Sequence, residues 1–203
     1  MTAKTIEYFY SAHSAYAYLG AWELERIAQE AGAEIIHRPF DFLPVMAAAG
    51  GKKFKERTAA HVDYFFGRDM YRWAELRGLP MVRFRPTYHD NPLALANGAI
   101  IAAPPAQQGG LSRAILQAHW RDDADIADPA AVCVLARNLG IDADALIKSA
   151  LTDEVQARHA ANTEEAIARG IFGSPTYFVE GDMFYGQDHL MMVARALEAP
   201  FQP

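Results

Sequence analysis

The spacing of apolar residues along this chain of 203 residues alternates between the pattern of a strand and that of a helix. Residues 5–10 (TIEYFY) mix β-branched and aromatic side chains before a polar turn, which is typical of a strand. In residues 15–31 apolar side chains recur at helical spacing until Gly32, where a helix is expected to end. Residues 33–39 (AEIIHRP) return to a strand pattern that a proline ends. These segments predict a β-α-β unit with two parallel strands.

The middle of the chain has a helical pattern for more than a hundred residues. Breaks rich in Gly, Pro or Asp separate the predicted helices, which cover residues 52–76, 91–103, 111–121, 129–139, 144–151 and 153–169. Asp128 and Asp142 are typical of helix starts, because a carboxylate there lies near the positive end of the helix dipole. The strand pattern returns after Gly170, in residues 176–179 and 183–185, and the turn between these runs predicts a hairpin. Residues 188–198 predict a last helix with one apolar face.

The predicted elements follow the order β-α-β, a helical block, then β-β-α. This is the order of a thioredoxin-like fold that is interrupted between its two halves. We therefore predict an α/β protein of the thioredoxin-like (DsbA-like) fold with a large all-helical insertion. Residues 1–40 and 170–203 would form the thioredoxin-like domain, and residues 41–169 would form the helical insertion domain.

Composition and charge narrow the classes of partner. Hydrophobic residues make up 51% of the chain and charged residues 22%, as in an ordinary soluble globular protein. The net charge is −6 with both signs mixed, whereas nucleic-acid surfaces and anionic-membrane anchors need clustered Lys and Arg. No apolar run is long enough to cross a bilayer, and the first residues do not have the pattern of a secretory signal. We expect a cytoplasmic protein that binds neither nucleic acid nor membranes.

The single cysteine, Cys133, lies among apolar residues at helical spacing. This placement favours a buried structural thiol over a nucleophile. One cysteine excludes an internal disulfide and dithiol redox chemistry, and no Cys/His cluster has the spacing of a zinc site. The sequence therefore predicts no metal site.

The first candidate for a functional site is Ser174-Pro175, just before a predicted strand. A proline here either begins an edge strand or, as is usual in a thioredoxin-like sheet, follows a cis peptide bond. A cis bond would turn the backbone N–H and C=O of Ser174 toward a ligand beside the first helix. Free peptide groups of this kind pair with an extended peptide such as glutathione.

The second candidate is the serine-rich turn before the first helix, which contains Ser11, His13 and Ser14. Ser14 is either a simple N-cap or a hydroxyl donor that, with the helix dipole, stabilises a bound anion such as a thiolate. The three residues lie too close in sequence to make an obvious catalytic triad, and the chain has no GxSxG motif.

The third candidate is the turn Gly186-Gln187-Asp188-His189 at the start of the last helix. Asp188 is a plausible helix cap. In a thioredoxin-like fold this turn also lies next to the cis-proline loop, where a carboxylate can pair with the amino group of a peptide ligand.

Several motifs together resemble those of the 2-hydroxychromene-2-carboxylate isomerase family, which is related to the kappa-class glutathione transferases within the DsbA-like fold. The motifs are FYSAHSAYAYLG near the start, DMYRWAELRGLP (69–80), HDNPLALA (89–96) and GIFGSPTYFVEGDMFYGQDHL (170–190). The last run is the most specific. The resemblance extends over nearly the whole chain, and it implies that Ser14 holds the glutathione sulfur where DsbA has a dithiol motif.

The chain also differs from the usual pattern of this family. Ser11 and Ala15 occupy positions where relatives have Asp and Pro, and His189 replaces an Arg. After the second strand, Met46 and Gly51 replace a Lys and a glutathione-contacting Asn. Lys52 and its neighbour Lys53 either bind the glutathione carboxylate or lie in solvent.

The resemblance implies a glutathione-dependent isomerase with a small aromatic carboxylate substrate. The implied cofactor site contains Ser14, Ser174, Pro175, Gln187, Asp188 and Lys52. The thiolate would add reversibly to an unsaturated 2-hydroxychromene carboxylate, allow rotation about a carbon–carbon bond, and leave. Two alternatives are a kappa-like glutathione transferase or peroxidase, and a DsbA-like binding protein without catalysis. Relatives are typically homodimers. Five aromatic residues either wall the substrate or belong to the core: Tyr64, Phe65, Trp73, Tyr88 and Phe172.

Overall fold

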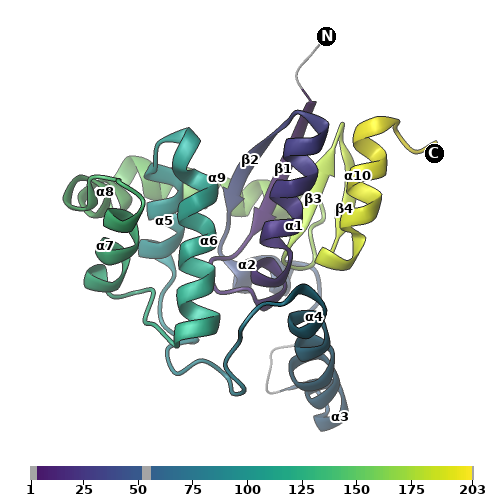
Figure 1. Cartoon of the computed structure of the whole chain (residues 1–203), viewed down its shortest axis with the longest axis horizontal. Coiled ribbons are helices and arrows are strands. Elements are labelled where there is room, and N and C mark those ends of the chain that lie inside the picture. The colour runs from purple at the N-terminus through teal and green to yellow at the C-terminus, as the bar shows by residue number, and fades with distance from the viewer. Residues whose placement is uncertain (1–3, 52–55, 203) are drawn as a thin grey trace.

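The computed structural model describes residues 4–51 and 56–202 (Figure 1). It begins with strand β1 (Lys4–Tyr10), helix α1 (Ala15–Ala31) and strand β2 (Ala33–Pro39). The bounds of α1 and β2 are those predicted, and β1 begins one residue earlier than predicted. Gly32 ends α1 in the left-handed conformation, with φ of 63°. The predicted β-α-β unit is therefore present, and its two strands are parallel.

Helices follow one another between β2 and the second pair of strands. They are α2 (Phe42–Ala48), α3 (Ala59–Val62), the π-helix η2 (Asp63–Asp69), α4 (Met70–Arg77), α5 (Ala94–Ala102), α6 (Pro105–Asp122), α7 (Pro129–Asn138), α8 (Ala143–Ala150) and α9 (Asp153–Ala168). In the described parts of the chain, no helix combines the length and apolarity needed to cross a membrane. The predicted division into two domains stays a prediction.

Strands β3 (Thr176–Val179) and β4 (Asp182–Tyr185) form the predicted hairpin, and a 3-10 turn η3 (Gln187–His189) leads into the last helix, α10 (Leu190–Glu198). The four strands lie in the order β2-β1-β3-β4. Strand β3 runs antiparallel to β1, with Tyr8 opposite Tyr177. This arrangement confirms the predicted thioredoxin-like sheet with its helical insertion.

The two faces of the sheet are covered by different helices (Figure 1). Ile6, Tyr8 and Tyr177 belong to the larger core, which α1 and α10 cover. Phe9 and Phe178 belong to a smaller core on the opposite face, beside α2 and α9. The guanidinium of Arg169, just after α9, lies 3.5 Å from the ring centroid of Phe178. The alternation of side chains along β1 thus separates two cores.

Short polar side chains begin several helices. Asp128 accepts a hydrogen bond from the backbone of Ala130, and Asp142 accepts one from Ala145. Thr152 caps α9 in the same way through the N–H of Val155. These caps satisfy N–H groups that have no partner within the helix, and they confirm the helix starts predicted at the two aspartates.

The structure differs from the sequence prediction in two helical regions. The sequence reading missed α2, whose Pro44 lies in the first turn, where a proline is tolerated. The segment predicted as one helix over residues 52–76 is divided into α3, η2 and α4 where it is described. The π-helix gives residues 63–69 a different side-chain spacing, which a regular 3.6-residue pattern does not anticipate.

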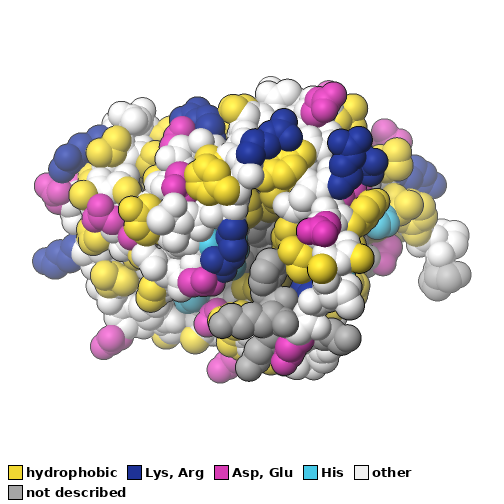
Figure 2. All heavy atoms as spheres, turned by 90° about the horizontal axis from the view of Figure 1, so that it is seen from below, with side chains coloured by type: hydrophobic (Ala, Val, Ile, Leu, Met, Phe, Trp, Pro, Cys, Tyr) yellow, Lys and Arg dark blue, Asp and Glu magenta, His cyan; other side chains and the backbone are white. Residues whose placement is uncertain are grey.

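Charged side chains of both signs are interspersed over the face seen in Figure 2, with hydrophobic side chains between them. Several charged side chains of the described residues form local ion pairs, as where Arg26 contacts both Glu23 and Glu30. Exposed pairs of this kind contribute little to stability. This face of the molecule therefore carries charges of both signs, as the composition indicated.

A row of tyrosines lies between the sheet and α1. The rings of Tyr8 and Tyr10 stack at 4.0 Å between centroids, and Tyr177 stacks on Tyr8 at 5.3 Å. The Tyr10 hydroxyl lies 2.9 Å from Nδ1 of His37 on β2. The buried hydroxyl of Tyr8, in contrast, has no hydrogen-bond partner within the described structure.

We predict that Tyr8→Phe leaves the free energy of unfolding unchanged or raises it, because the substitution removes a buried hydroxyl that lacks a partner. Tyr10→Phe should lower it by about 1–2 kcal/mol, since Nδ1 of His37 would lose its partner. Urea denaturation of both variants measures the difference. Equal destabilisation by the two substitutions would show that the Tyr8 hydroxyl has a partner, such as a buried water.

Candidate functional site

The turn between β1 and α1 is fixed by hydrogen bonds of its own serines. The Ser14 N–H donates to the carbonyl of Ser11 at 2.9 Å, and Ser14 Oγ accepts from the N–H of Ala17 at 3.2 Å. Ser14 is therefore the N-cap of α1, as one interpretation of the sequence proposed. Its side chain is half-buried, so the hydroxyl lies at the edge of the protein surface.

The peptide bond between Ser174 and Pro175 is cis, as predicted. The Ser14 hydroxyl donates to the Ser174 carbonyl at 3.1 Å, and the N–H of Ser11 donates to Ser174 Oγ, also at 3.1 Å. The structure thus brings the start of α1 against the cis-proline loop, which lies about 160 positions later in the sequence. This confirms the predicted contact between the two segments.

Aromatic side chains surround this junction. The ring of Tyr185, at the end of β4, lies so close to Gly173 that a Cβ there would be 2.3 Å from a ring carbon. Phe172 contacts the same ring, with 4.7 Å between centroids, and its side chain is exposed. Only glycine at position 173 allows the tyrosine ring to lie against the residue before the Ser174-Pro175 pair.

Tyr16, in the first turn of α1, connects this junction to the helical insertion. Its hydroxyl lies 2.9 Å from Asp69 Oδ2 and 2.9 Å from the carbonyl oxygen of Phe65. Burial raises the pKa of Tyr16, and the hydrogen bond to the Asp69 carboxylate raises it further. The hydroxyl therefore stays protonated and holds η2 beside the start of α1.

Asp188 lies on the other side of the junction with a half-exposed carboxylate. Burial is the main cause that raises the pKa values of Tyr16 and Tyr185, and the negative charge of Asp188 raises both further. These three groups are therefore electrostatic neighbours. Gly186 makes room for this carboxylate, because a Cβ there would lie 2.3 Å from Asp188 Oδ1. Asp188 is thus available to a ligand that contacts these tyrosines.

Gln187 is placed differently from Asp188. Its side chain is buried, and its Oε1 accepts hydrogen bonds from Nε and Nη2 of Arg77 on α4, at 3.0 and 2.7 Å. The Gln187 side chain also packs closely on α1, because a Cβ on Gly20 of that helix would lie 2.7 Å from the Cβ of Gln187. This side chain therefore joins η3 to α1 and α4. Lys52, the remaining predicted cofactor residue, lies outside the described residues.

Three histidines lie behind the serine turn. His13 Nδ1 is 2.8 Å from Ser11 Oγ, and the ring of His13 lies 4.6 Å from that of His89, in the loop before α5. His89 Nδ1 is in turn 2.9 Å from Nε2 of His119 on α6. Burial is the main cause that lowers the pKa values, to about 3 for His13, about 2 for His89 and about 4 for His119. All three rings are neutral at pH 7.

The backbone of the turn is also held by the helical insertion. The N–H of Ala12 donates to Asn97 Oδ1 on α5 at 3.1 Å, and the indole N–H of Trp120 on α6 donates to the carbonyl of His13 at 2.9 Å. Asn97 is fully buried. The insertion therefore fixes the turn that carries Ser14.

This arrangement is suited to binding an anion beside peptide groups. A 17-residue helix directs its N-terminus at the junction, and Ser14 adds a hydroxyl donor. No group of three or more His, Cys, Asp or Glu with metal-binding geometry occurs within residues 4–51 and 56–202. Cys133 is half-buried on α7, away from the junction, and so is more exposed than predicted.

The predicted aromatic residues are only partly brought together. Phe172 lies at the junction, and Phe65 is held beside Tyr16. Trp73 instead lines a separate surface pocket together with Leu19 and Trp22, farther along α1. The sequence reading missed Tyr16 and Tyr185, since isolated tyrosines carry no signal until a fold places them.

Comparison with known proteins identifies the relationship. The DSBA-like thioredoxin domain family matches residues 5–198. The chain belongs to this family. A curated 2-hydroxychromene-2-carboxylate isomerase of Pseudomonas sp. strain C18 is 27% identical over 192 residues, which is 95% of this chain and 89% of the relative. The resemblance predicted from the motifs is therefore confirmed.

A second relative and a solved structure are also similar to this DSBA-like chain. Glutathione s-transferase kappa 2 of Caenorhabditis elegans is 24% identical over 98% of the chain and 94% of the relative. The solved structure of a 2-hydroxychromene-2-carboxylate isomerase superposes with a TM-score of 0.82 at 25% identity, over 96% of this chain and 94% of that one. The fold is thus shared over almost the full length of both proteins.

The histidine cluster predicts a steep loss of stability in acid. Each ring has a lower pKa in the folded state than its ordinary 6.5, so the unfolded chain binds more protons below that pH. This stability is fully present above pH 6.5 and is lost as the pH falls toward the folded-state values. Each such proton changes the free energy of unfolding by about 1.4 kcal/mol per pH unit.

We expect His119→Gln to reduce the slope of the unfolding free energy against pH between pH 6 and about 4.5. The reduction should be about 1.4 kcal/mol per pH unit, which corresponds to one proton. Urea denaturation across this range measures the slope. Gln117→Ala, on the same helix, removes no titratable group; it is the matched control and should keep the wild-type slope. An unchanged slope in His119→Gln would mean that this ring titrates alike in the folded and unfolded states.

Proposed function

We propose that the protein is a glutathione-dependent isomerase of the 2-hydroxychromene-2-carboxylate type. The observation that carries the proposal is the Ser14 hydroxyl, which caps α1 and contacts the Ser174 carbonyl beside the cis-proline. The relatives named as isomerases, which align over almost the whole chain, support the reaction type. The kappa-class relative supports glutathione as the cofactor.

Glutathione binding would redirect the hydroxyl of Ser14. This hydroxyl now donates to the Ser174 carbonyl, which is the group that an extended peptide would use through its own N–H. When the cysteinyl N–H of glutathione takes this carbonyl, the Ser14 hydroxyl is released to donate to the adjacent sulfur. Ser14 is therefore a donor to the thiolate rather than a nucleophile.

Electrostatics at the turn favour the anionic sulfur. The N-terminus of α1 is the positive end of its dipole, and Ser14 adds a donor there. Ser11 and His13 bond to each other as neutral groups, so they place no negative charge beside the sulfur. These features lower the pKa of a bound thiol without a lysine or a metal ion.

The rest of the site would orient glutathione and the substrate. The half-exposed Asp188 carboxylate would pair with the glutathione amino group, and the Ser174-Pro175 backbone would pair with its peptide groups. Phe172 and Tyr185 provide an aromatic wall for a flat carboxylate substrate. Bound glutathione would supply a sulfur nucleophile for reversible addition to the unsaturated substrate, and Ser14 would hold that sulfur in its anionic form.

The kappa-class relative favours one alternative, a glutathione transferase acting on another electrophile. The same thiolate site would serve this reaction, because the two activities differ in whether the sulfur leaves again. Incubation of the protein and glutathione with 2-hydroxychromene-2-carboxylate and with a panel of electrophiles separates them. Isomerised product with unchanged glutathione supports the isomerase, whereas a stable conjugate supports the transferase.

We predict that Ser14→Ala lowers the glutathione-dependent kcat/KM by about 2–4 kcal/mol of transition-state stabilisation, the range for losing one well-placed donor to an anion. The lost helix cap should lower the free energy of unfolding by only about 1 kcal/mol. Thr152→Ala removes the corresponding cap of α9 and is the matched control, with a similar loss of stability and unchanged turnover. Equal turnover of the two variants would refute the assigned role of Ser14.

We also predict that glutathione bound near neutral pH shows the ultraviolet absorbance of a thiolate. Free thiols ionise near pH 8.5, so the signal requires a lowered pKa. The absorbance should disappear in Ser14→Ala while calorimetry still detects binding through Pro175 and Asp188. S-methylglutathione is the control ligand, since it binds without an ionisable thiol. A signal that persists in Ser14→Ala would assign the shift to the helix dipole.

A further inference from the structure

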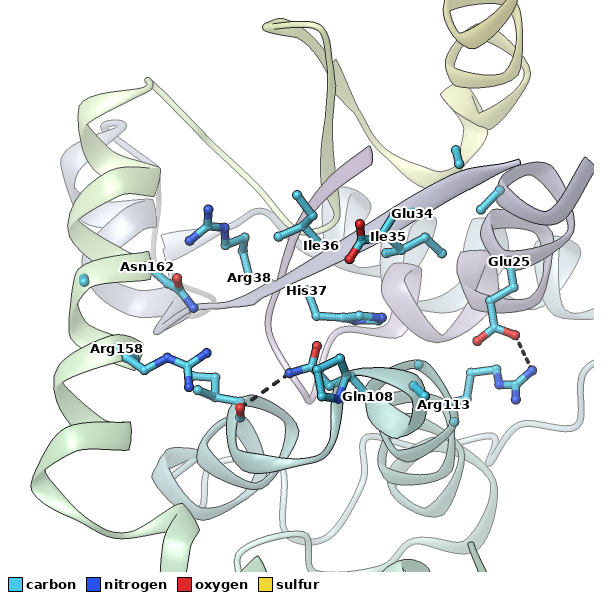
Figure 3. Close-up of a pocket in the computed structure, with 18 residues that line it drawn as sticks. Glu25, Glu34, Ile35, Ile36, His37, Arg38, Gln108, Arg113, Arg158 and Asn162 are labelled. Carbon is cyan, nitrogen blue, oxygen red and sulfur yellow. Dashed lines mark hydrogen bonds and ion pairs between the residues drawn. The ribbon is translucent and has the colours of Figure 1, made fainter. Parts of the chain in front are cut away.

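A cavity of about 880 Å³ lies along the outer edge of β2, and none of the residues of the serine turn lines it (Figure 3). We call it the β2 groove. Its floor is β2 itself, and its walls come from α1, α6 and α9. Its lining includes Glu25, Glu34, His37, Gly109, Arg158 and Ala161. The volume falls within the range of ligand pockets.

The groove leaves the outer edge of β2 accessible. This strand is the last of the sheet on its side, and its other edge pairs with β1. In the described part of the chain, no helix or loop makes a hydrogen bond to the backbone of residues 33–38. Because alternate residues of a strand direct their N–H and C=O groups outward, the groove contains a row of unused backbone donors and acceptors.

A polar side chain of the α1 wall and one of the β2 floor both lie beside Gly109 on α6. A Cβ on Gly109 would lie 3.2 Å from Glu25 Oε1 and 3.6 Å from His37 Nε2. The other oxygen of Glu25 pairs with Arg113. Nδ1 of His37 bonds to the Tyr10 hydroxyl, so Nε2 remains for a ligand. The bare glycine therefore leaves an acceptor and an imidazole nitrogen directed into open space.

The charges are separated along the groove. Glu25 and Glu34 lie toward the start of β2, whereas Arg38 and Arg158 lie toward its end, as Figure 3 shows. Arg158 has no ion pair or hydrogen bond among the described residues. The two ion pairs of Arg38, with Glu7 and Glu165, are 3.9 and 3.7 Å long and exceed hydrogen-bond distance. Glu25 is neutralised by its pair with Arg113, so Glu34 at one end and Arg158 at the other are the groove charges that have no ion pair among the described residues.

We propose that the β2 groove binds a short extended peptide, which adds to β2 as a parallel strand. Its amino terminus would lie toward Glu25 and Glu34, and its carboxyl terminus would lie at Arg38 and Arg158. The strand residues 33–38 span about 17 Å at roughly 3.3 Å per residue, so about six residues of ligand fit. Main-chain pairing would supply affinity for many sequences, and the charged ends would set the direction.

The same features argue against a second copy of this chain as the occupant. Wall residues of α6 and α9 lie on either side of the strand edge in each copy. Pairing two β2 edges would bring both sets of helices into the same space. A single extended segment has no such helices, and it matches the alternation of donors and acceptors on the groove floor.

The test uses the full chain and the peptide Val-Thr-Val-Thr-Val-Asp with both termini free, measured by isothermal titration calorimetry. We expect saturable 1:1 binding and slower hydrogen exchange at amides of residues 33–38. Amidation of the carboxyl terminus with Asn as the last residue should weaken binding about tenfold, as should Arg158→Glu, because each removes a charge-assisted contact.

Two matched pairs of variants control for folding and for charge. Ala161→Trp fills the groove from an exposed position of α9 and should abolish binding, whereas Ala160→Trp, exposed on the same helix but outside the groove, should not. Lys148→Glu on α8 changes the net charge as Arg158→Glu does and should retain binding. All four variants should keep the turnover proposed for the serine site, which makes this test independent of that proposal.

Three results would overturn the proposal. Absence of peptide binding together with a change of oligomeric state in Ala161→Trp, seen by sedimentation, would make the groove an interface between copies. Binding of succinate as tight as that of the peptide would indicate a site for small anions. Peptide binding that is insensitive to both Arg158→Glu and amidation would show that the charged end does not direct it.

Discussion

The contact between Ser14 and Ser174 is the constraint on which the candidate site depends. Two hydrogen bonds, from the Ser14 hydroxyl and from the Ser11 backbone, join the first turn of the fold to the cis-proline loop. They require β1 and β3 to be neighbours, which the antiparallel register provides. The helix N-terminus, the Ser14 hydroxyl and the peptide groups of the cis-proline loop meet only because these two loops meet. Each is an ordinary structural feature without the others.

The helical insertion supports this contact from behind. Asn97 and Trp120 hold the backbone of the turn, and the three neutral histidines fill the space between the turn and α6. Their burial without charge explains how imidazoles can lie so close to one another. The insertion therefore determines where the serine turn lies relative to the sheet.

The sequence predicted those parts of the structure that depend on local pattern. The bounds of α1 and β3, the helix starts at Asp128 and Asp142, and the cis bond before Pro175 all follow from spacing, caps or a motif. Contacts between distant segments were not predictable in the same way. Nothing adjacent to Gln187 in the sequence indicates that Arg77 binds its side chain, and nothing adjacent to Tyr185 indicates that it lies on Gly173.

Tyr10 lies between the serine turn and the β2 groove, and its backbone and hydroxyl contact different sides. Its backbone leads directly into the serine turn, where the carbonyl accepts from Phe40, whereas its hydroxyl bonds to His37 at the β2 groove. The ring crosses the buried side of the sheet between them. A ligand at His37 would thus contact the hydrogen-bond partner of Tyr10, and the backbone of Tyr10 adjoins Ser11. Coupling between two sites requires an element with two discrete arrangements that both ligands bias, and this contact alone does not provide one. The serine site and the groove are therefore independent surfaces of one sheet.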